Sequence, residues 1–467
     1  MTGHRQATLA AAGLVLGVVA VVAGGQSPTG TTTPPTTWFG LLSPTGYRAG
    51  DPWGWGAASL LASALLVPLW VVAVGSRLPE RAVWRLAAVW GLPFVIGPPL
   101  ISKDVYAYAA NGLMLRAGVD VYTHGADGLQ QLHTADATRA LAAVDPTWHQ
   151  TPSPYGPLAS LLVRTAAQVS GGNPVGTVVV LRAVAVVSVV ALAAAAAALA
   201  GRHRATAVAL IALNPLVLLH AVSGAHVEAP MCALLLLGLL AATRNRWALA
   251  VVLVCAAGAI KAPAYAALGA MVVLHARQRD PVRAVGQDVA VALAASAAFT
   301  VLVPHGLGWL ANLTTPTKGK APVSLANAVA ALLPGVGAHP VQLGFLAAGA
   351  VIVVGLALTA ERRPLETSVG IGLLALMALA PVFYPWYVLW GAACLLPTAR
   401  GRGREGLIVL CGLAALFATT GTPSRFALIL HGVEAAVAAG WLVQRYRAQP
   451  VEEEPLTRPR PATGTRS

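Results

Sequence analysis

Long apolar stretches, separated by short arginine-rich segments, constrain this chain more than any other feature. Examples are residues 56–75, 178–200, 285–303 and 341–360. A helix of about 20 apolar residues is long enough to cross the hydrocarbon core of a bilayer. Only 10% of the residues are charged, whereas soluble domains carry roughly 25%. The sequence therefore predicts an all-α polytopic membrane protein with about 13 to 14 transmembrane helices.

The arginines between these stretches predict which side of the membrane each connection faces. Arg77, Arg81 and Arg85 share one short connection, and Arg244 and Arg246 share another. Short loops rich in arginine stay in the cytoplasm. This orientation leaves 102–155 and 304–340 as two larger extracytoplasmic loops. The net charge of +14 then belongs to loops that meet anionic lipid, and nucleic acid is not expected as a partner.

The predicted organisation is one multispan domain, residues 1–443, in the plasma membrane, followed by a disordered cytoplasmic tail, 444–467. Two segments allow alternatives. Residues 7–24 are predicted as a retained span, although a positive start and an apolar core also fit a cleaved signal peptide. Residues 157–170 are predicted as a re-entrant or interfacial helix rather than a full span, because 178–200 must then end at cytoplasmic arginines.

Asp104 is the most distinctive polar residue, because it emerges outside the membrane directly after the predicted span 82–101. It begins a predicted short helix, 104–116, that lies along the interface. An aspartate here either caps a helix or acts as a general base on a hydroxyl that attacks a lipid-linked substrate. Lys103 precedes it, and Tyr106 and Tyr108 follow within the same short segment.

Four further ionisable residues lie near the membrane boundary. His226 and Glu228 end a span, where such residues either form a capping pair or face a cavity. Lys261 lies in a short apolar hairpin, so it needs an anionic partner, extends to the surface or binds an anion. Arg425 follows Thr-Pro-Ser in a predicted connection on the outer side of the membrane, where it either anchors the helix or binds phosphate. We predict anion binding for Lys261, with Arg425 as a second phosphate ligand.

Aromatic residues gather in the outer segments. They either belong to the belt that aromatic side chains form at membrane surfaces or stack on a sugar or acyl chain. The residues in question are Trp148, Tyr155, Tyr384, Trp386 and Tyr387.

Motifs for metal and nucleotide chemistry are not found in the sequence. Three histidines and three aspartates of the first outer loop match no compact ligand spacing, so no metal site is predicted. They are His124, His133 and His149, with Asp127, Asp136 and Asp145. No Walker loop, no GxGxxG after a strand and no HExxH is present, which argues against an ATP-driven pump.

Several of these segments, in this order, resemble the actinobacterial polyprenol-phosphate-mannose-dependent α-1,6-mannosyltransferases of the C-type glycosyltransferase superfamily. The resemblance runs from about Ser102 to Trp390. Its motifs are Ser102-Lys-Asp-Val-Tyr-Ala-Tyr-Ala-Ala-Asn-Gly112, Asp145-Pro-Thr-Trp148, Thr151-Pro-Ser-Pro-Tyr-Gly-Pro157, Gly224-Ala-His-Val-Glu228, Lys261-Ala-Pro263 and Tyr384-Pro-Trp-Tyr387.

The resemblance implies a C-type glycosyltransferase architecture with an extracytoplasmic active site. Mannose would pass from a mannosyl phosphoryl polyprenol to a growing lipid-anchored α-1,6-mannan, as in lipomannan and lipoarabinomannan. The superfamily's catalytic aspartate falls on Asp104, and Lys261, Arg425 or Lys103 would stabilise the leaving phosphate. No cofactor is required, although a divalent cation stays open. The substrate-binding residues expected on this reading are Tyr106, Tyr108, Trp148, Tyr155, His226, Glu228, Tyr384 and Trp386.

Two alternatives stay open at this level. A related enzyme that uses another polyprenyl-phosphate sugar, such as arabinose, or that mannosylates proteins would keep the same mechanism. A transporter or flippase of lipid-linked sugars shares the many spans and the charges within the membrane, but it favours internal repeats, which are not evident here.

Overall fold

The computed structural model describes residues 2–26, 52–313, 324–333 and 335–416. This part of the chain contains helices and no strand, as expected for an all-α membrane protein. Two sequence predictions lie outside the described residues: the phosphate ligand Arg425 and the tail 444–467.

The longer helices are connected by 3₁₀ turns and one π-helical segment, η4 (Val217–Ser223). The helices are α1 (Thr2–Gln26), α2 (Pro52–Gly75), α3 (Glu80–Ile96), α4 (Asp104–Arg116), α5 (Ala135–Ala143), α6 (Pro157–Val169), α7 (Pro174–Ala200), α8 (Arg204–Ala212), α9 (Glu228–Thr243), α10 (Trp247–Ile260), α11 (Ala266–Gln278), α12 (Pro281–Val301), α14 (Leu325–Leu332), α15 (Ala338–Leu358), α16 (Leu365–Leu379), α17 (Val388–Leu395) and α18 (Gly401–Leu416). The short segments used below are η1 (Ala126–Leu132), η2 (Pro146–Trp148), η5 (Ala262–Tyr265), η6 (Gly308–Asn312) and η8 (Pro385–Tyr387).

Five helical runs in the described residues are long and apolar enough to cross a membrane, or six if the bent pair η4 and α9 forms one span. One of these runs, Pro174–Ala212, contains a turn at Gly201, where φ is 56° and α8 folds back against α7. Apolar side chains on these helices face outward, as lipid contact requires: Leu293 is 66% exposed and Val351 is 71% exposed. The chain is an all-α polytopic membrane protein. The expected count of about 13 to 14 spans is higher because it also counts shorter and broken helices as spans. That count stays a prediction.

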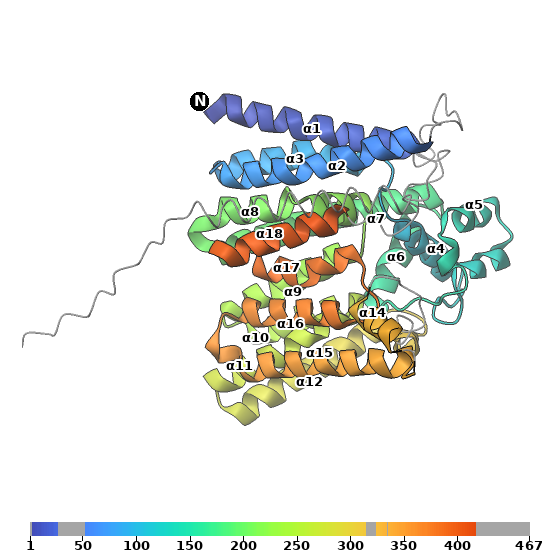
Figure 1. Ribbon diagram of the computed structural model, residues 1–467. Helices are drawn as coiled ribbons and strands as arrows, with labels where there is room; N and C mark the ends of the chain where they lie inside the picture. The colour runs from blue at the N-terminus through green and yellow to red at the C-terminus, as the bar shows by residue number, and fades with distance from the viewer. Residues whose placement is uncertain (1, 27–51, 314–323, 334, 417–467) are drawn as a thin grey trace, which may run out of the picture.

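The long helices lie side by side with nearly parallel axes, and α4, α5 and α6 gather at one end (Figure 1). Buried indoles join neighbouring helices. Trp90 of α3 donates a 2.9 Å hydrogen bond to the carbonyl of Leu9 in α1, and Trp70 of α2 donates a 2.8 Å bond to Ala209 in α8. Such bonds fix helix positions because an unpaired polar group is costly in lipid.

The segment that follows α3 positions the polar end of the bundle. Pro98 and Pro99 cannot continue a helix, and α3 ends at Ile96. The chain then turns through Ile101, whose φ is 69°, and α4 begins at Asp104, as the sequence predicted. The helix α6 has 13 residues, fewer than the about 20 that a span requires, which is consistent with a re-entrant or interfacial position.

Candidate active site

Asp104 is the first residue of α4, and its side chain is only 14% exposed. Burial raises the pKa of its carboxyl, and the negative charge of Glu228 raises it further. The Lys261 ammonium and hydrogen bonds from Trp148 and Ser102 offset part of this rise. The pKa of Asp104 is therefore about 7. A carboxyl group with this pKa accepts a proton at neutral pH more readily than an ordinary aspartate, as a general base requires.

His226 and Glu228 approach Asp104 from a break in another helix. The chain bends by 107° between η4 and α9, and His226 lies within that bend. Its Nδ1 atom is 3.7 Å from Oδ2 of Asp104 and 4.0 Å from Oε2 of Glu228. Both side chains are fully buried. The bend therefore places an imidazole between two carboxyl groups that are far apart in sequence.

Lys261 lies in the break between α10 and η5, and its ammonium forms an ion pair with Oε1 of Glu228. The nitrogen Nζ is 4.1 Å from the ring centroid of Tyr387 and 5.2 Å from that of Trp390. Of the three options considered for Lys261, the structure thus supplies an anionic partner. An ammonium has three donors, so donors remain for a bound anion beside Glu228.

Aromatic side chains form the walls around these charges. The hydroxyl of Tyr108 lies 3.4 Å from that of Tyr155 and 3.4 Å from Nδ1 of His226. Trp386 stacks on His226 with ring centroids 4.0 Å apart, and Tyr384 stacks on Trp386 at 4.9 Å. We call the connected set the Asp104 cluster. Its members are Asp104, Tyr108, Trp148, Tyr155, His226, Glu228, Lys261, Tyr384, Trp386, Tyr387 and Trp390.

Most predicted site residues of the described chain meet in this cluster, but two lie differently. Lys103 precedes α4 and is half-buried. Tyr106 lies on the side of α4 near Arg182: burial raises the pKa of its hydroxyl, and the Arg182 guanidinium offsets part of that rise. The prediction that Tyr106 contacts substrate therefore has less support from the geometry than the same prediction for Tyr108.

Arg182 is a buried residue of the site region that the sequence analysis did not identify. It lies on α7, is 2% exposed, and donates hydrogen bonds to the carbonyls of Val95, Gly97 and Ser223. The Ser223 hydroxyl in turn accepts a 3.0 Å bond from the Leu100 amide. These bonds tie together the segments directly before Asp104 and His226. Burying an arginine within an apolar stretch costs free energy, so such a residue usually has a specific role. Its presence at position 182 was the sequence signal that could have identified it.

Replacing Arg182 is expected to disturb the site through these carbonyls. Arg182→Met should lower the free energy of unfolding by at least about 2 kcal/mol, because hydrogen bonds from a charged donor are lost. It should also lower kcat, whereas Arg182→Lys should retain part of both. Thermal unfolding and transfer rates measure the effect. Arg139→Met, at an exposed arginine of α5, is the matched control, and equal behaviour of the two variants would contradict the positioning role.

Trp390 and His220 are further neighbours that the sequence analysis did not identify, because each lies in an apolar stretch. Trp390 stacks on Tyr387 with ring centroids 4.2 Å apart. His220 of η4 lies 5.3 Å from the ring centroid of Trp386. Their position in the site depends on tertiary packing that local sequence does not encode.

The histidines and aspartates of the first outer loop have separate local contacts. The His149 ring lies 3.3 Å from the carbonyl of Val144, Asp136 pairs with Arg139, and Asp145 accepts a bond from the Thr147 amide. Across the described residues, no group of three or more histidine, cysteine, aspartate or glutamate side chains is arranged to hold a metal ion.

Comparison with known proteins identifies relatives of this chain. Residues 7–277 match the family model of the alpha-(1→6)-mannopyranosyltransferase N-terminal domain. Alpha-(1→6)-mannopyranosyltransferase A of Mycobacterium tuberculosis is 30% identical over 363 residues, which cover 72% of this chain and 68% of the relative. Alpha-(1→6)-mannopyranosyltransferase B of Corynebacterium glutamicum is 28% identical over 361 residues, 68% of this chain and 59% of the relative. No solved structure gives a significant match. The chain belongs to the alpha-(1→6)-mannopyranosyltransferase family.

Proposed function

We propose that this membrane mannosyltransferase uses mannosyl phosphoryl polyprenol as donor and extends a lipid-anchored α-1,6-mannan on the outer face of the plasma membrane. The observation that supports this proposal most directly is the Asp104 carboxyl. It has a pKa of about 7 and lies at the start of α4, beside a buried ion pair and stacked aromatic rings. A base, a cation and sugar-stacking surfaces are the groups that such a transfer needs.

The proposed step is a single displacement. Asp104 removes the proton of the acceptor 6-hydroxyl, and that oxygen attacks the anomeric carbon of the donor mannose. The bond from this carbon to the phosphate oxygen breaks on the opposite face, so the β-linked donor gives an α-linked product. Polyprenyl phosphate leaves with the bonding electrons. Lys261 is placed to stabilise its charge with the donors that Glu228 does not use.

The aromatic walls have a separate task in this proposal. Trp386 is 3% exposed and is already stacked on both His226 and Tyr384, so it supports the wall from behind. The half-buried rings of Tyr384 and of Tyr155, which lies next to Tyr108, are the ones proposed to meet the sugar. Flat rings of this kind stack against the apolar face of a pyranose and keep bulk water away from the reacting carbon. They would hold the sugar while the charged groups act on its oxygens.

The proposed function predicts transfer with a distinct pH dependence. Purified protein in nanodiscs, supplied with labelled mannosyl phosphoryl polyprenol and a short α-1,6-mannoside, should form a new α-1,6 linkage. Because the base is active only when deprotonated and its pKa is about 7, kcat/KM should rise as the pH increases through 7 and then level off.

Three outcomes would contradict parts of the proposal. A rate that falls as pH increases through 7 would exclude Asp104 as the base. Transfer of another sugar, or to a protein hydroxyl, would retain the mechanism and change the substrates. Movement of the mannosyl lipid between leaflets without a new linkage would favour a transporter.

A further inference from the structure

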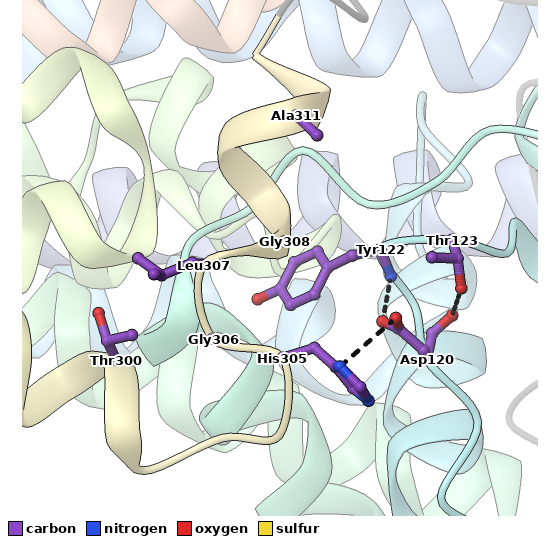
Figure 2. Close-up of a pocket in the computed structure, with 9 residues that line it drawn as sticks. All are labelled: Asp120, Tyr122, Thr123, Thr300, His305, Gly306, Leu307, Gly308 and Ala311. Carbon is purple, nitrogen blue, oxygen red and sulfur yellow. Dashed lines mark hydrogen bonds and ion pairs between the residues drawn. The ribbon is translucent and has the colours of Figure 1, made fainter.

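A cavity with several polar groups in a mainly apolar lining lies apart from the Asp104 cluster, between two segments of the chain. It has a volume of about 450 Å³ and is lined by the segment after α4 and by the segment from the end of α12 into η6 (Figure 2). Small-molecule sites commonly have volumes of roughly 300–1,000 Å³. The residues that matter for its chemistry are Asp120, Tyr122, Thr123, Thr300, His305 and Leu307.

The two walls of the cavity are held together by fixed hydrogen bonds. The side-chain amide of Asn312 donates to the carbonyls of Tyr122 and Ser153, at 2.9 and 3.2 Å. The Tyr122 hydroxyl is 2.8 Å from that of Ser160 in α6. Gly308 lies so close to the Tyr122 ring that a Cβ atom at this position would collide with it. The cavity is therefore a built feature of the fold.

The same hydrogen bonds connect the cavity to the candidate active site. Ser153 receives the bond from Asn312 and lies two residues before Tyr155, whose hydroxyl is 3.4 Å from that of Tyr108. One short extended segment thus has the cavity at one end and the Asp104 cluster at the other.

The lining favours a neutral ligand rich in hydroxyl groups. Nδ1 of His305 is 4.0 Å from Oδ2 of Asp120, and His305 is 66% exposed (Figure 2). Thr123 and Thr300 add hydroxyl groups, and Leu307 adds an apolar surface. None of the described residues that line the cavity is a lysine or an arginine. A phosphate would thus meet the Asp120 carboxylate without a permanent cation, whereas sugar hydroxyls can donate to that carboxylate.

Exposed apolar residues form a rim beside the cavity, at the end of the candidate span α12. Leu307 lines the cavity and is 61% exposed, and Val301 and Leu302, which follow the lining residue Thr300, are 80% and 49% exposed. Exposed apolar side chains at the end of a spanning helix indicate that this rim lies close to the membrane surface. An acceptor whose lipid anchor remains in the bilayer would pass this rim.

We infer that the cavity is a second sugar subsite, which binds a mannose unit of the acceptor at a distance from the unit that receives the new sugar. The inference rests on the proposed function, because it takes the acceptor to be an α-1,6-mannan. The subsite adds a dependence of binding on acceptor length, which the Asp104 cluster alone does not supply. Acceptors long enough to reach the cavity should bind more tightly than shorter ones.

The test compares α-1,6-mannosides of increasing length as acceptors. For the wild type, KM should fall once the acceptor reaches the cavity. Asp120→Asn and Ala311→Trp should raise KM for the long acceptor by about tenfold. They should leave KM for the short acceptor and for the donor unchanged. Asp136→Asn and Ala142→Trp are matched controls, because they make the same changes on α5 outside the cavity, at a partly exposed and an exposed position.

Binding measured without turnover separates this inference from the proposed function. Saturation-transfer NMR of an α-1,6-tetramannoside with nanodisc protein should show contacts that Ala311→Trp removes and Ala142→Trp retains. If the tetramannoside binds in this way but no transfer occurs, the proposed function fails and the subsite stands. The subsite is overturned if the cavity variants and the controls bind equally. It is also overturned if short and long acceptors are weakened alike.

Discussion

Asp104→Asn is expected to fold normally and to transfer mannose about 10²- to 10⁴-fold more slowly than the wild type, the range that a general base contributes. The amide has the same size and keeps the hydrogen bond from Trp148, but it does not accept the acceptor proton at neutral pH. Burial, which raises the pKa of Asp104 to about 7, disfavours the charged form, so a neutral side chain should not destabilise the fold. Single-turnover transfer assays with saturating donor measure the loss.

Asp136→Asn serves as control for this variant, because it removes a carboxylate from the same predicted loop, 102–155, at a partly exposed site paired with Arg139. It should transfer at the rate of the wild type. If Asp104→Asn retains full transfer while the unfolding temperature is unchanged, Asp104 is not the base. The remaining carboxyl group beside His226 is then that of Glu228.

The second large effect is expected at the buried ion pair. Glu228 is fully buried and Lys261 is 11% exposed, so removing one partner leaves an unpaired charge in a poorly solvated place. Glu228→Gln or Lys261→Met alone should therefore lower the free energy of unfolding by roughly 3–5 kcal/mol. The double variant should recover much of this stability, since neither charge then remains. Thermal unfolding in one detergent compares all three proteins.

Transfer rates distinguish a structural pair from a functional one. If Lys261 also stabilises the leaving phosphate, the double variant should fold yet remain inactive. Full recovery of transfer by the double variant would restrict the pair to a structural role. Glu80→Gln, which breaks the exposed pair with Arg204, is the control and should change the stability by no more than about 1 kcal/mol.

The fold class was predictable because helices that cross a membrane have a recognisable sequence pattern. A helix in lipid must be apolar over about 20 residues, and arginine marks its cytoplasmic end. Asp104 could be proposed as the base because it directly follows a predicted span and because the motif 102–112 around it resembles the family. The short helix predicted over 104–116 is α4 in the structure.

Which residues form pairs in the site, and toward which neighbours their side chains point, were less predictable. Glu228 and Lys261 are 33 positions apart, so only the packed fold shows that they meet. Tyr106 and Tyr108 lie two positions apart on α4, and residues with this spacing point to different sides of a helix. Their sequence alone gave no reason to place Tyr108 toward His226 and Tyr106 toward Arg182. Arg182 and Trp390 lie within apolar stretches that were already explained as predicted spans, so neither was considered as a site residue.

The way in which the Asp104 cluster is assembled has a consequence for chimeric enzymes. Its charged groups lie within residues 7–277, which match the family model, whereas Tyr384, Trp386, Tyr387 and Trp390 lie beyond that segment. A hybrid of two relatives joined near residue 278 would take the acid–base groups, with Tyr108, Trp148 and Tyr155, from one parent and the aromatic side chains of 384–390 from the other. Under the proposed function, such hybrids would test whether these later aromatic side chains set sugar preference, without altering any charged residue of the Asp104 cluster.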